Sequence, residues 1–289
     1  MTGIKEPVKT ALIMEGGAMR GMFTCGVIDV LMKNDIRFDG AAGISAGATF
    51  GCNYKSKQIG RPLRYNKKYS RDPRYCSFRS LIKTGDLYGA DFCYRELPDV
   101  LDPFDRETFR KNPTAFYIGA TDVRTGKCVY HKCSDGGEKD ITWMRASASM
   151  PLVSRPVSVD GYLLLDGGIS DAVPFRFMEK QGYRRNLIIL TQPEGYRKSR
   201  TKGLPLMKRM LREYPAVVRA MEKRHRMYNR QMKEIMEREK KGISFVIRPP
   251  QSLEIRRTEK DPRQLERVYR IGRREAEKAL PELKRFLNA

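Results

Sequence analysis

Hydrophobic and polar residues follow one another near the start of the chain in a way that predicts two consecutive strand-loop-helix units. Residues 9–14 (KTALIM) form a short apolar run, and after a glycine-rich loop apolar residues recur at helical spacing over residues 22–31. Residues 38–44 (FDGAAGI) predict a second strand, and residues 46–57 predict a second helix. Because such units place their strands side by side in one direction, the order favours an α/β fold with a parallel sheet covered by helices.

The middle of the chain predicts shorter elements. Residues 58–113 are basic, aromatic and interrupted by proline, and they predict short helices and loops over one edge of the sheet. The pattern leaves open whether this segment forms a lid. The other predicted elements are strands at 116–120 and 127–131, a helix stopped by Pro151, a hairpin of strands 157–159 and 162–165, a helix at 173–181 and a strand at 186–191.

The last third of the chain has a mainly helical pattern. Apolar residues recur every three or four positions over residues 204–241, which predicts one or two long amphipathic helices with a bend at Pro215. A strand at 243–247 and a basic helix at 261–287 complete the chain.

Positive charge is concentrated in this last part. The 289 residues carry a formal net charge of +23, and residues 195–289 supply +16 of it, with 28 Lys and Arg against 12 Asp and Glu. We therefore divide the chain into a core at residues 1–200 and a basic, mainly helical extension at residues 201–289 that packs on the core within one structural domain. A field of this sign attracts polyanions, either nucleic acid or anionic lipid, and charge alone does not choose between them.

The sequence predicts a cytoplasmic protein that does not span the membrane. Its longest apolar runs, such as residues 187–190, fall far short of the roughly 20 residues that cross a bilayer. The first 17 residues lack the apolar region of a secretory signal. The stretch CVYHKC at 128–133 places His131 between two thiols, but no second ligand pair follows at zinc spacing, so we expect no metal and no cofactor.

Residues 43–47 read GISAG, which fits a motif that holds a serine on a sharp strand-to-helix bend. Ser45 is then a candidate nucleophile, and Gly43 and Gly47 form its elbow, although small residues also suit an ordinary tight turn. The loop EGGAMRG at 15–21 precedes a helix, so its backbone N–H groups can stabilise a negative charge. It is neither a GxGxxG nor a P-loop motif, because Ala18 and Met22 stand where those motifs need glycine and lysine.

A nucleophilic serine needs a base, and the sequence offers three candidates. His225 lies on the apolar stripe of the long predicted helix, where a packing role is favoured, and His131 is no better placed near a strand end. Asp166 ends the apolar strand in GYLLLDGG, as expected of an acid presented at the edge of a sheet, although DGG is also an ordinary turn. An aspartate has an ordinary pKa of about 3.9, so this role requires burial and close geometry.

The three elements EGGAMRG (15–21), GISAG (43–47) and DGG (166–168) resemble, in this order, the motifs of the patatin-like phospholipases, over roughly residues 9–191. The resemblance implies a three-layer α/β fold with a central, mostly parallel sheet. It also implies hydrolysis of lipid acyl esters through an acyl-enzyme, without metal. The residues that carry these implied roles are Ser45 as nucleophile, Asp166 as general base, Gly167 and Gly168 as the acid motif, and Gly16, Gly17, Ala18 and Met19 as backbone donors of the oxyanion hole.

Two positions of the loop qualify the resemblance. Arg20 matches the basic position of the family's loop, next to Gly21, and can orient the loop, help bind a phosphate or form a salt bridge with a nearby acid. Ala18 stands where the family often has a third glycine, and an alanine is tolerable there if its φ is negative.

The sequence therefore predicts a serine lipid acyl hydrolase of the phospholipase A or lysophospholipase type. Its basic surface can hold it peripherally on anionic headgroups, at about 1 kcal/mol per basic residue near the surface. One alternative is a soluble carboxylesterase or acyl-CoA thioesterase with the same Ser45/Asp166 dyad. A nucleic-acid-binding protein is a weaker alternative, because the sequence lacks an RNP stretch, a C2H2 pattern and a basic-region zipper. Headgroup preference, chain length and oligomeric state are left open.

Overall fold

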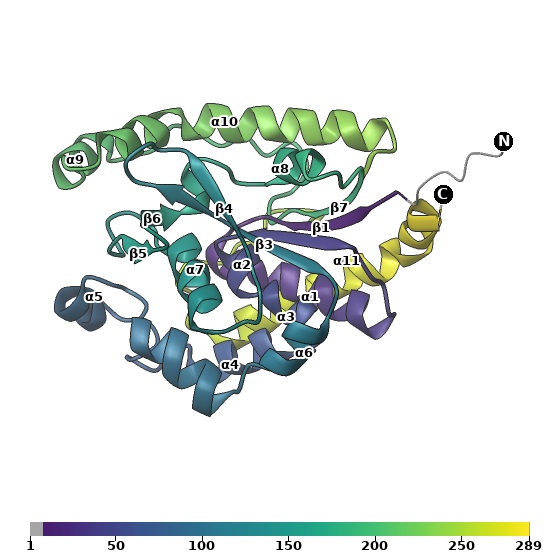
Figure 1. Cartoon of the computed structure of the whole chain (residues 1–289), viewed down its shortest axis with the longest axis horizontal. Helices are drawn as coiled ribbons and strands as arrows, with labels where there is room; N and C mark the ends of the chain where they lie inside the picture. Colours follow the sequence, from purple (N-terminus) through teal and green to yellow (C-terminus); the bar gives the residue numbers. More distant parts are fainter. Residues whose placement is uncertain (1–7, 289) are drawn as a thin grey trace.

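One eight-stranded sheet forms the centre of the computed structural model, which describes residues 8–288 (Figure 1). Its strands are β1 (Thr10–Met14), β2 (Gly40–Ile44), β3 (Ala115–Asp122), β4 (Cys128–Lys132), β5 (Val157–Val159), β6 (Tyr162–Asp166), β7 (Arg185–Ile189) and β8 (Ser244–Ile247). Neighbouring strands in the order β3-β2-β1-β7-β8 run parallel, whereas β4 and β6 pair antiparallel with β3, and β5 with β6. The predicted mostly parallel α/β sheet is confirmed.

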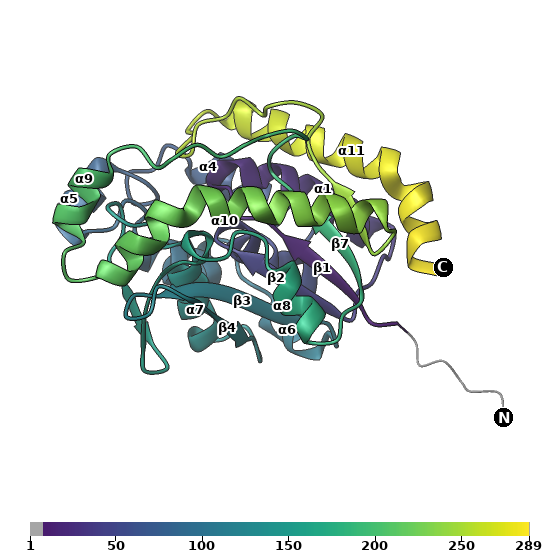
Figure 2. The same cartoon turned by 90° about the horizontal axis from the view of Figure 1, so that it is seen from above.

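Helices cover both faces of this sheet, which gives three layers (Figures 1 and 2). The helices are η1 (Ala18–Arg20), α1 (Gly21–Lys33), α2 (Ala46–Thr49), α3 (Cys52–Lys55), α4 (Arg61–Tyr69), α5 (Phe78–Thr84), η2 (Phe92–Leu101), α6 (Arg106–Lys111), α7 (Glu138–Ala148), η3 (Gly167–Ile169), α8 (Phe175–Lys180), α9 (Leu204–Met210), α10 (Pro215–Lys240) and α11 (Pro262–Asn288). Leu12 and Met14 of β1 pack in the core that contains α1 and α11, whereas Ala11 and Ile13 pack in the core that contains α8 and α10. Since alternate strand residues point to opposite faces, a strand buried on both faces needs a continuous apolar run.

The C-terminal helix α11 belongs to the same core as the N-terminal helix α1. A Cβ atom on Gly26 of α1 would lie 2.1 Å from the backbone oxygen of Tyr269, and one on Gly272 of α11 would lie 2.0 Å from the oxygen of Phe23. The two helix backbones therefore touch, which is possible only with glycine at the crossing. The division of the chain at residue 200 stays a prediction, and residues 1–7 and 289 lie outside the described part.

The helix predicted at residues 46–57 is wrong as a single element, because the chain forms two one-turn helices, α2 and α3. The break falls at Gly51, where a Cβ atom would lie 2.2 Å from the Gly47 oxygen and 2.5 Å from the Met14 sulfur. The chain therefore turns directly against β1 at this point, and the backbone N–H of Asn53 bonds three residues back to Phe50. Tertiary packing overrides the local helical pattern here.

Pro215 does not bend a continuous helix as predicted. It is instead the first residue of α10, and the preceding helix α9 already ends at Met210. Proline suits the first helical position because its missing N–H would have no partner there. Of the one or two long helices predicted, the structure has the short α9 and the long α10, with a loop between them.

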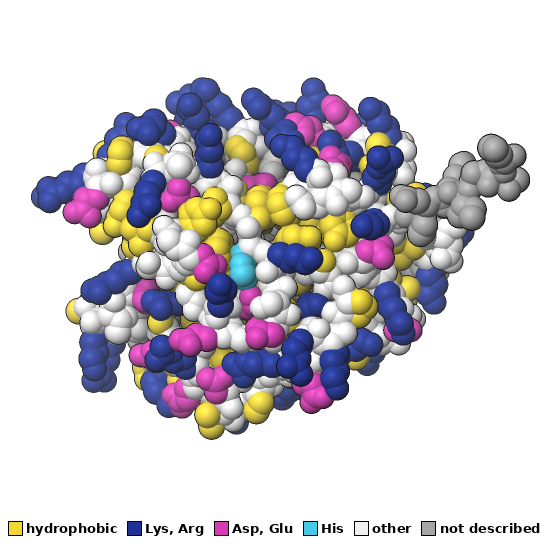
Figure 3. Space-filling view, in the orientation of Figure 1, with side chains coloured by type: hydrophobic (Ala, Val, Ile, Leu, Met, Phe, Trp, Pro, Cys, Tyr) yellow, Lys and Arg dark blue, Asp and Glu magenta, His cyan; other side chains and the backbone are white. Residues whose placement is uncertain are grey.

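Residues 58–113 form four short helices, α4, α5, η2 and α6, as predicted, and these lie together below the sheet in Figure 1. Aromatic rings hold this segment together, with Phe92 packing edge to face on Tyr69 at 5.4 Å and on Tyr75 at 6.2 Å between ring centroids. Lysine and arginine side chains are spread over the surface, many of them along α9 and α10 at the top of Figure 3. No helix within residues 8–288 is long and apolar enough to cross a membrane.

Candidate active site

Ser45 lies on a sharp turn between β2 and α2. Its backbone has φ 55° and ψ −120°, a positive-φ conformation that residues other than glycine rarely adopt. Gly43 and Gly47 permit the turn, because a Cβ on Gly43 would lie 2.1 Å from the Gly47 oxygen, and one on Gly47 would lie 2.3 Å from the Met14 oxygen. The chain therefore forms a strand-to-helix elbow that presents the serine at the carboxyl end of β2.

Asp166 reaches Ser45 because β2 and β6 meet end to end along one edge of β3. Ile44 pairs with Gly119 of β3, and Asp166 pairs with the next residue of β3, Ala120. The Ser45 hydroxyl donates a hydrogen bond of 2.7 Å to Asp166 Oδ2 across a sequence separation of 121 residues. Both residues are buried, with exposures of 9% and 5%. The two candidate residues from the sequence therefore lie within hydrogen-bond distance.

The environment of Asp166 favours its protonated form more than water does. Burial raises the pKa of the Asp166 carboxyl above its ordinary value, against the hydrogen bond from Ser45 and the positive charge of Arg224. The other carboxylate oxygen accepts the N–H of Gly168 at 2.7 Å, and Thr121 donates its hydroxyl to the Asp166 carbonyl at 2.8 Å. A carboxylate so fixed and with raised proton affinity is suited to take a proton from the serine.

Gly167 and Ser147 help to fix the positions of Ser45 and Asp166. A Cβ on Gly167 would lie 2.3 Å from the Gly119 oxygen, so only glycine lets the chain turn here after β6. Ser147 of α7 accepts a hydrogen bond of 2.8 Å from the Ser45 N–H and donates one of 2.7 Å to the Gly119 carbonyl. Sequence reasoning missed Ser147, because nothing in the local pattern links it to a residue 102 positions earlier.

The glycine-rich loop between β1 and α1 lies directly against Ser45. A Cβ on Gly16 would lie 2.9 Å from the Ser45 Cβ. Within the described residues, the backbone N–H groups of Gly16 and Gly17 donate to no protein acceptor. Gly16, Gly17 and Ala18 line one small pocket together with Ser45, whereas Met19 lines the neighbouring pocket. The loop therefore offers unpaired N–H groups beside the serine hydroxyl.

The structure corrects two expectations for this loop. Ala18 has φ 49°, so the negative φ that would make an alanine tolerable is not observed, and the loop is strained at this position. Arg20 forms no ion pair with any residue between 8 and 288, and its Nε is buried without a hydrogen-bond partner. The salt bridge considered for Arg20 is therefore not formed. Gly21 begins α1 against Phe50, where a Cβ would lie 2.8 Å from the ring.

Neither histidine lies beside Ser45. His131 pairs through Nε2 with Asp140 at 2.6 Å and stacks on Trp143, with the ring centroids 4.9 Å apart. His225 lies on α10, and its Nδ1 is buried without a hydrogen-bond partner. Neither residue lines the pocket that contains Ser45, so the geometry pairs the serine with a carboxylate.

Ser45 stands at the junction of two pockets of different character. The aromatic pocket, about 120 Å³ in volume, shares Ala18, Ser45 and Met150 with the second pocket and is otherwise lined mainly by apolar side chains, including Phe50, Tyr65, Tyr75, Tyr88, Tyr94 and Leu97. Most of these side chains belong to the 58–113 segment, which therefore forms the outer wall of this pocket. The second pocket, about 50 Å³, is polar and cationic and is lined by Glu15, Arg20, Asp166, Lys198, Arg224, Tyr228 and Arg257 among others.

Sequence reasoning missed Lys198, Arg224 and Arg257 as site residues. Arg224 is fixed at the site by a hydrogen bond of 2.7 Å from its Nε to the Gly168 carbonyl. The only sequence signal for these residues is the excess of basic residues after position 195, which does not distinguish site residues from surface residues.

His131, Cys133 and Asp140 bring three ligand-type atoms within 4.8 Å of one another. The Asp140 carboxylate is already engaged, because one oxygen contacts His131 and the other accepts the backbone N–H groups of Ser134 and Gly136. The cluster is therefore explained as an internal hydrogen-bond network at the start of α7.

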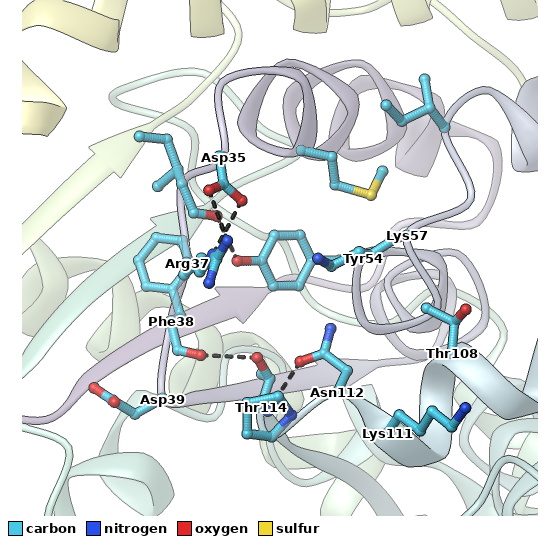
Figure 4. Close-up of a pocket in the computed structure, with 14 residues that line it drawn as sticks. Asp35, Arg37, Phe38, Asp39, Tyr54, Lys57, Thr108, Lys111, Asn112 and Thr114 are labelled. Atoms are coloured by element: carbon cyan, nitrogen blue, oxygen red, sulfur yellow. Dashed lines mark hydrogen bonds and ion pairs between the residues drawn. The ribbon is translucent and has the colours of Figure 1, made fainter.

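A larger cavity, about 680 Å³, lies at the other end of β2 (Figure 4). It is bordered by Asp39, which precedes β2, whereas Ser45 follows β2, so about five residues of strand, or roughly 16 Å, separate the two. Its Asp35 and Arg37 pair with each other, and Tyr54 donates its hydroxyl to a backbone carbonyl. The hydroxyl of Thr108 in its lining donates to the Asp105 carboxylate at 2.7 Å, but Asp105 is exposed and caps α6, and these hydrogen bonds lower the pKa of its carboxyl. This carboxylate is therefore a poor base, and the size of a cavity alone does not identify the site.

A family model agrees with the motifs. The Patatin-like phospholipase family model matches residues 12–178, which is more than half of the chain. A second family model, described as Domain of unknown function (DUF6363), matches residues 214–288. The crystal structure of VipD from Legionella pneumophila aligns with a TM-score of 0.46 and 11% identity, over 96% of this chain and 67% of that one.

Several curated proteins are similar in sequence. "Uncharacterized protein YjjU" of Escherichia coli is 29% identical over 193 residues, covering 65% of this chain and 53% of that protein. "Uncharacterized NTE family protein Rv1063c" of Mycobacterium tuberculosis is 29% identical over 166 residues, covering 57% and 44%. "Lysophospholipase NTE1" of Meyerozyma guilliermondii is 27% identical over 178 residues, covering 59% and 12%. The chain thus spans about half the length of the first two relatives, and the match of the family model shows that it belongs to the patatin-like phospholipase family.

Proposed function

We propose that the protein is a serine lipid acyl hydrolase of the phospholipase A or lysophospholipase type, with Ser45 as nucleophile and Asp166 as general base. The observation that carries this proposal is the 2.7 Å hydrogen bond from the Ser45 hydroxyl to the buried Asp166 carboxylate, on an elbow beside the glycine-rich loop. Membership of the patatin-like phospholipase family supports lipid esters as the substrate class.

The geometry supports a two-step reaction through an acyl-enzyme. Ser45 Oγ attacks the ester carbonyl while Asp166 accepts the hydroxyl proton, and the N–H groups of the loop from Gly16 to Met19 stabilise the oxyanion. The intermediate collapses, the alcohol leaves with the proton from Asp166, and the acyl group stays on Ser45. Water then attacks the acyl-enzyme while Asp166 takes a proton from it. The bond between the acyl carbon and Ser45 Oγ breaks, Asp166 gives its proton to Oγ, and the carboxylic acid is released.

The aromatic pocket supports an acyl chain as the group transferred to Ser45. Its lining of Phe50, Tyr65, Tyr75 and Leu97 offers apolar surface that begins at the serine itself. Removing apolar surface from water is worth about 25 cal/mol per Å², so the chain of a lipid gains from entering this pocket. An acyl-CoA thioesterase or a carboxylesterase with the same dyad is the second candidate, because both also transfer an acyl group.

We further propose that the enzyme works peripherally on anionic membranes. Large apolar side chains are exposed on α5 (Phe78 77% and Ile82 87%) and on α9 (Leu206 58% and Met210 56%). The two helices lie at the same end of the molecule in Figures 1 and 2. Exposed basic residues flank these side chains, among them Arg79, Lys83, Lys208 and Arg209. This combination of apolar and cationic side chains suits insertion at an anionic lipid surface. The predicted cytoplasmic location rests on the N-terminal sequence, whose first seven residues lie outside the described part.

Labelling with a fluorophosphonate probe tests the enzyme proposal. Wild type should be labelled at Ser45, as identified by peptide mass spectrometry, and Ser45→Ala should not be labelled. Absence of labelling in folded wild type would contradict the nucleophile and favour a nucleic-acid-binding role for the basic surface.

Vesicle sedimentation tests the membrane proposal. Phe78→Ser combined with Ile82→Ser should weaken binding to phosphatidylglycerol vesicles by tenfold or more, since each buried apolar side chain contributes about 1.5–3 kcal/mol. Ile243→Ser, an exposed position beyond the far end of α10, is the control and should bind as wild type does. Equal binding by all variants, or turnover that gains nothing on vesicles over monomeric esters, would favour the soluble esterase or thioesterase.

A further inference from the structure

Four cationic side chains converge on the small pocket beside Ser45. They are Arg20, Lys198, Arg224 and Arg257, and we call them the cationic cleft. Within residues 8–288 none of the four takes part in an ion pair, although Arg20, Lys198 and Arg224 are half-buried and only Arg257 is exposed. Most of the other buried or half-buried arginines of the described chain have carboxylate partners, as Arg238 has with Glu179.

The two carboxylates of the pocket balance only part of this positive charge. Glu15 is 2% exposed and is already bonded, with Oε2 accepting the Thr191 N–H at 2.6 Å and Oε1 accepting the Tyr228 hydroxyl at 2.8 Å. Asp166 is occupied by Ser45 and the following turn. Four cations therefore face two engaged carboxylates, an excess of two positive charges in a partly buried cleft.

The fold holds these like charges together in spite of their repulsion. Burial and the neighbouring Arg224 lower the pKa of Lys198 to about 8, and partial burial with the charges of Arg20 and Arg224 lowers the pKa of Arg257. Lys198 is kept in place over the ring of Tyr228, with Nζ 4.4 Å from the ring centroid. An arrangement that costs free energy when empty is stabilised when an anion occupies it.

The size and position of the cationic cleft limit which anion it can bind. The cleft itself has a volume of about 50 Å³, and it also contains the N–H groups of Gly16 and Gly17 that face the oxyanion. It shares Ala18, Ser45 and Met150 with the aromatic pocket, so an ester at Ser45 has apolar surface on one side and cations on the other. Lys198, Arg224 and Arg257 also line a wider groove of about 470 Å³, which has room for an anionic group beside the oxyanion and for the rest of a headgroup.

We propose that the cationic cleft binds the phosphate of a glycerophospholipid or lysophospholipid substrate, on the opposite side of Ser45 from the acyl chain. This inference rests on the proposed function. It assigns recognition of the substrate's phosphate to Lys198, Arg224 and Arg257, which come from the C-terminal part of the chain. In a glycerophospholipid only a few bonds separate the phosphate from the acyl ester, which matches cations that line the same small pocket as the nucleophile. In acyl-CoA a long arm separates the phosphates from the thioester, so that substrate fits less well.

Two substrates with the same acyl groups test the inference. Monomeric dihexanoyl phosphatidylglycerol carries the phosphate, and monomeric 1,2-dihexanoylglycerol lacks it. For Lys198→Gln combined with Arg257→Gln, the ratio of kcat/KM on the first substrate to kcat/KM on the second should fall by on the order of tenfold to a hundredfold, because each lost contact is a charge-assisted hydrogen bond. The loss should reside mainly in KM.

Matched controls separate local recognition from overall charge. Arg197→Gln combined with Arg256→Gln removes the same charge from exposed neighbours outside the pocket and should keep the wild-type ratio. Lys198→Arg should also keep the ratio, because it preserves the charge. Equal losses on both substrates, an unchanged ratio, or the same fall in the control pair would overturn the inference.

Inorganic phosphate distinguishes a headgroup site from a site for free phosphate. It should compete with dihexanoyl phosphatidylglycerol in wild type and should do so less strongly in the Lys198/Arg257 variant. A different result would show that the cleft binds free phosphate and that the headgroup assignment is wrong. In that case inorganic phosphate changes the turnover of dihexanoylglycerol, while the variant keeps the wild-type ratio of kcat/KM on the two substrates. Hydrolysis of neither substrate by wild type would reject the proposed function, and this inference with it.

Discussion

The two sides of Ser45 are built by different parts of the chain. The aromatic side is lined only by residues from Ala18 to Ser154, within the segment that the patatin-like model matches. The cationic side takes Arg20 from that segment but Lys198, Arg224 and Arg257 from the chain beyond it, and the last two lie in the segment matched by the domain of unknown function. In our proposal, reaction chemistry and headgroup recognition therefore belong to separate regions of the chain.

The packing role of the C-terminal part does not explain why it places positive charge in the pocket. Helices α10 and α11 bury apolar stripes against the sheet, and that function needs no arginine in the pocket. Three cations nevertheless lie at the serine without ion-pair partners in the described chain. The C-terminal part therefore packs the core with one set of side chains and faces the proposed substrate with another.

The largest expected effect concerns the chemistry on the side of the patatin-like segment. Ser45→Ala and Asp166→Asn should each lower kcat/KM on a neutral short-chain ester by about a thousandfold or more, because each removes a participant in the attack step. His131→Asn and His225→Asn are the controls and should retain most of the activity. A loss in His225→Asn as deep as that in Asp166→Asn would replace the proposed dyad with a serine-histidine pair.

The pH dependence should distinguish the two sides. Asp166 acts as a base only when it is ionised, and burial raises its pKa. We therefore expect kcat/KM on the neutral ester to rise with pH, and the midpoint of this rise to lie above the ordinary aspartate pKa of about 3.9. Lys198 has a pKa of about 8, so kcat/KM on the phosphate-bearing substrate should fall by several-fold as pH rises through about 8, when the lysine loses its charge. Lys198→Arg should abolish only the alkaline fall. An identical alkaline fall on both substrates would assign it to another group.

Docking of the C-terminal part on the core can be broken at one glycine. Gly272→Ala should lower stability by about 1–3 kcal/mol, because its Cβ would lie 2.0 Å from the Phe23 oxygen and would push α11 from α1. Thermal unfolding measures the effect, with Arg274→Ala, an exposed position of the same helix, as the control. If α11 is only loosely attached, the glycine variant will unfold at the wild-type temperature.

The smallest expected effect concerns the strained loop. Ala18→Gly should leave stability unchanged or raise it by less than about 1 kcal/mol, since relief of the positive φ is offset by the greater freedom of glycine in the unfolded chain. Comparing Tm and kcat of the two forms checks this. A clear loss of stability would show that the methyl group makes a contact that outweighs the strain.

Much of the fold could be predicted from the sequence because its signals are local. The continuous apolar runs of β1 and β7 indicate strands buried on both faces, and the Asp160-Gly161 turn indicates the β5-β6 hairpin. The failure at residues 46–57 has a physical cause, since Gly51 packs against β1 and no local pattern records that contact. The positive φ of Ala18 could not be predicted from the sequence either. The loop that imposes it packs against Ser45 and Thr191, which are distant in sequence.

By itself, the sequence determined the motifs and their order: a glycine loop, a serine between glycines, and an aspartate at a strand end. Only the tertiary structure decided that Ser45 and Asp166 meet, because the register of β3 places the end of β2 beside the end of β6. It also decided which of many basic residues face the site, since Arg224 of α10 meets Lys198 and Arg257, which come from loops before and after that helix. Periodicity and turn chemistry act between neighbours in sequence, whereas a site is made by residues that folding brings together.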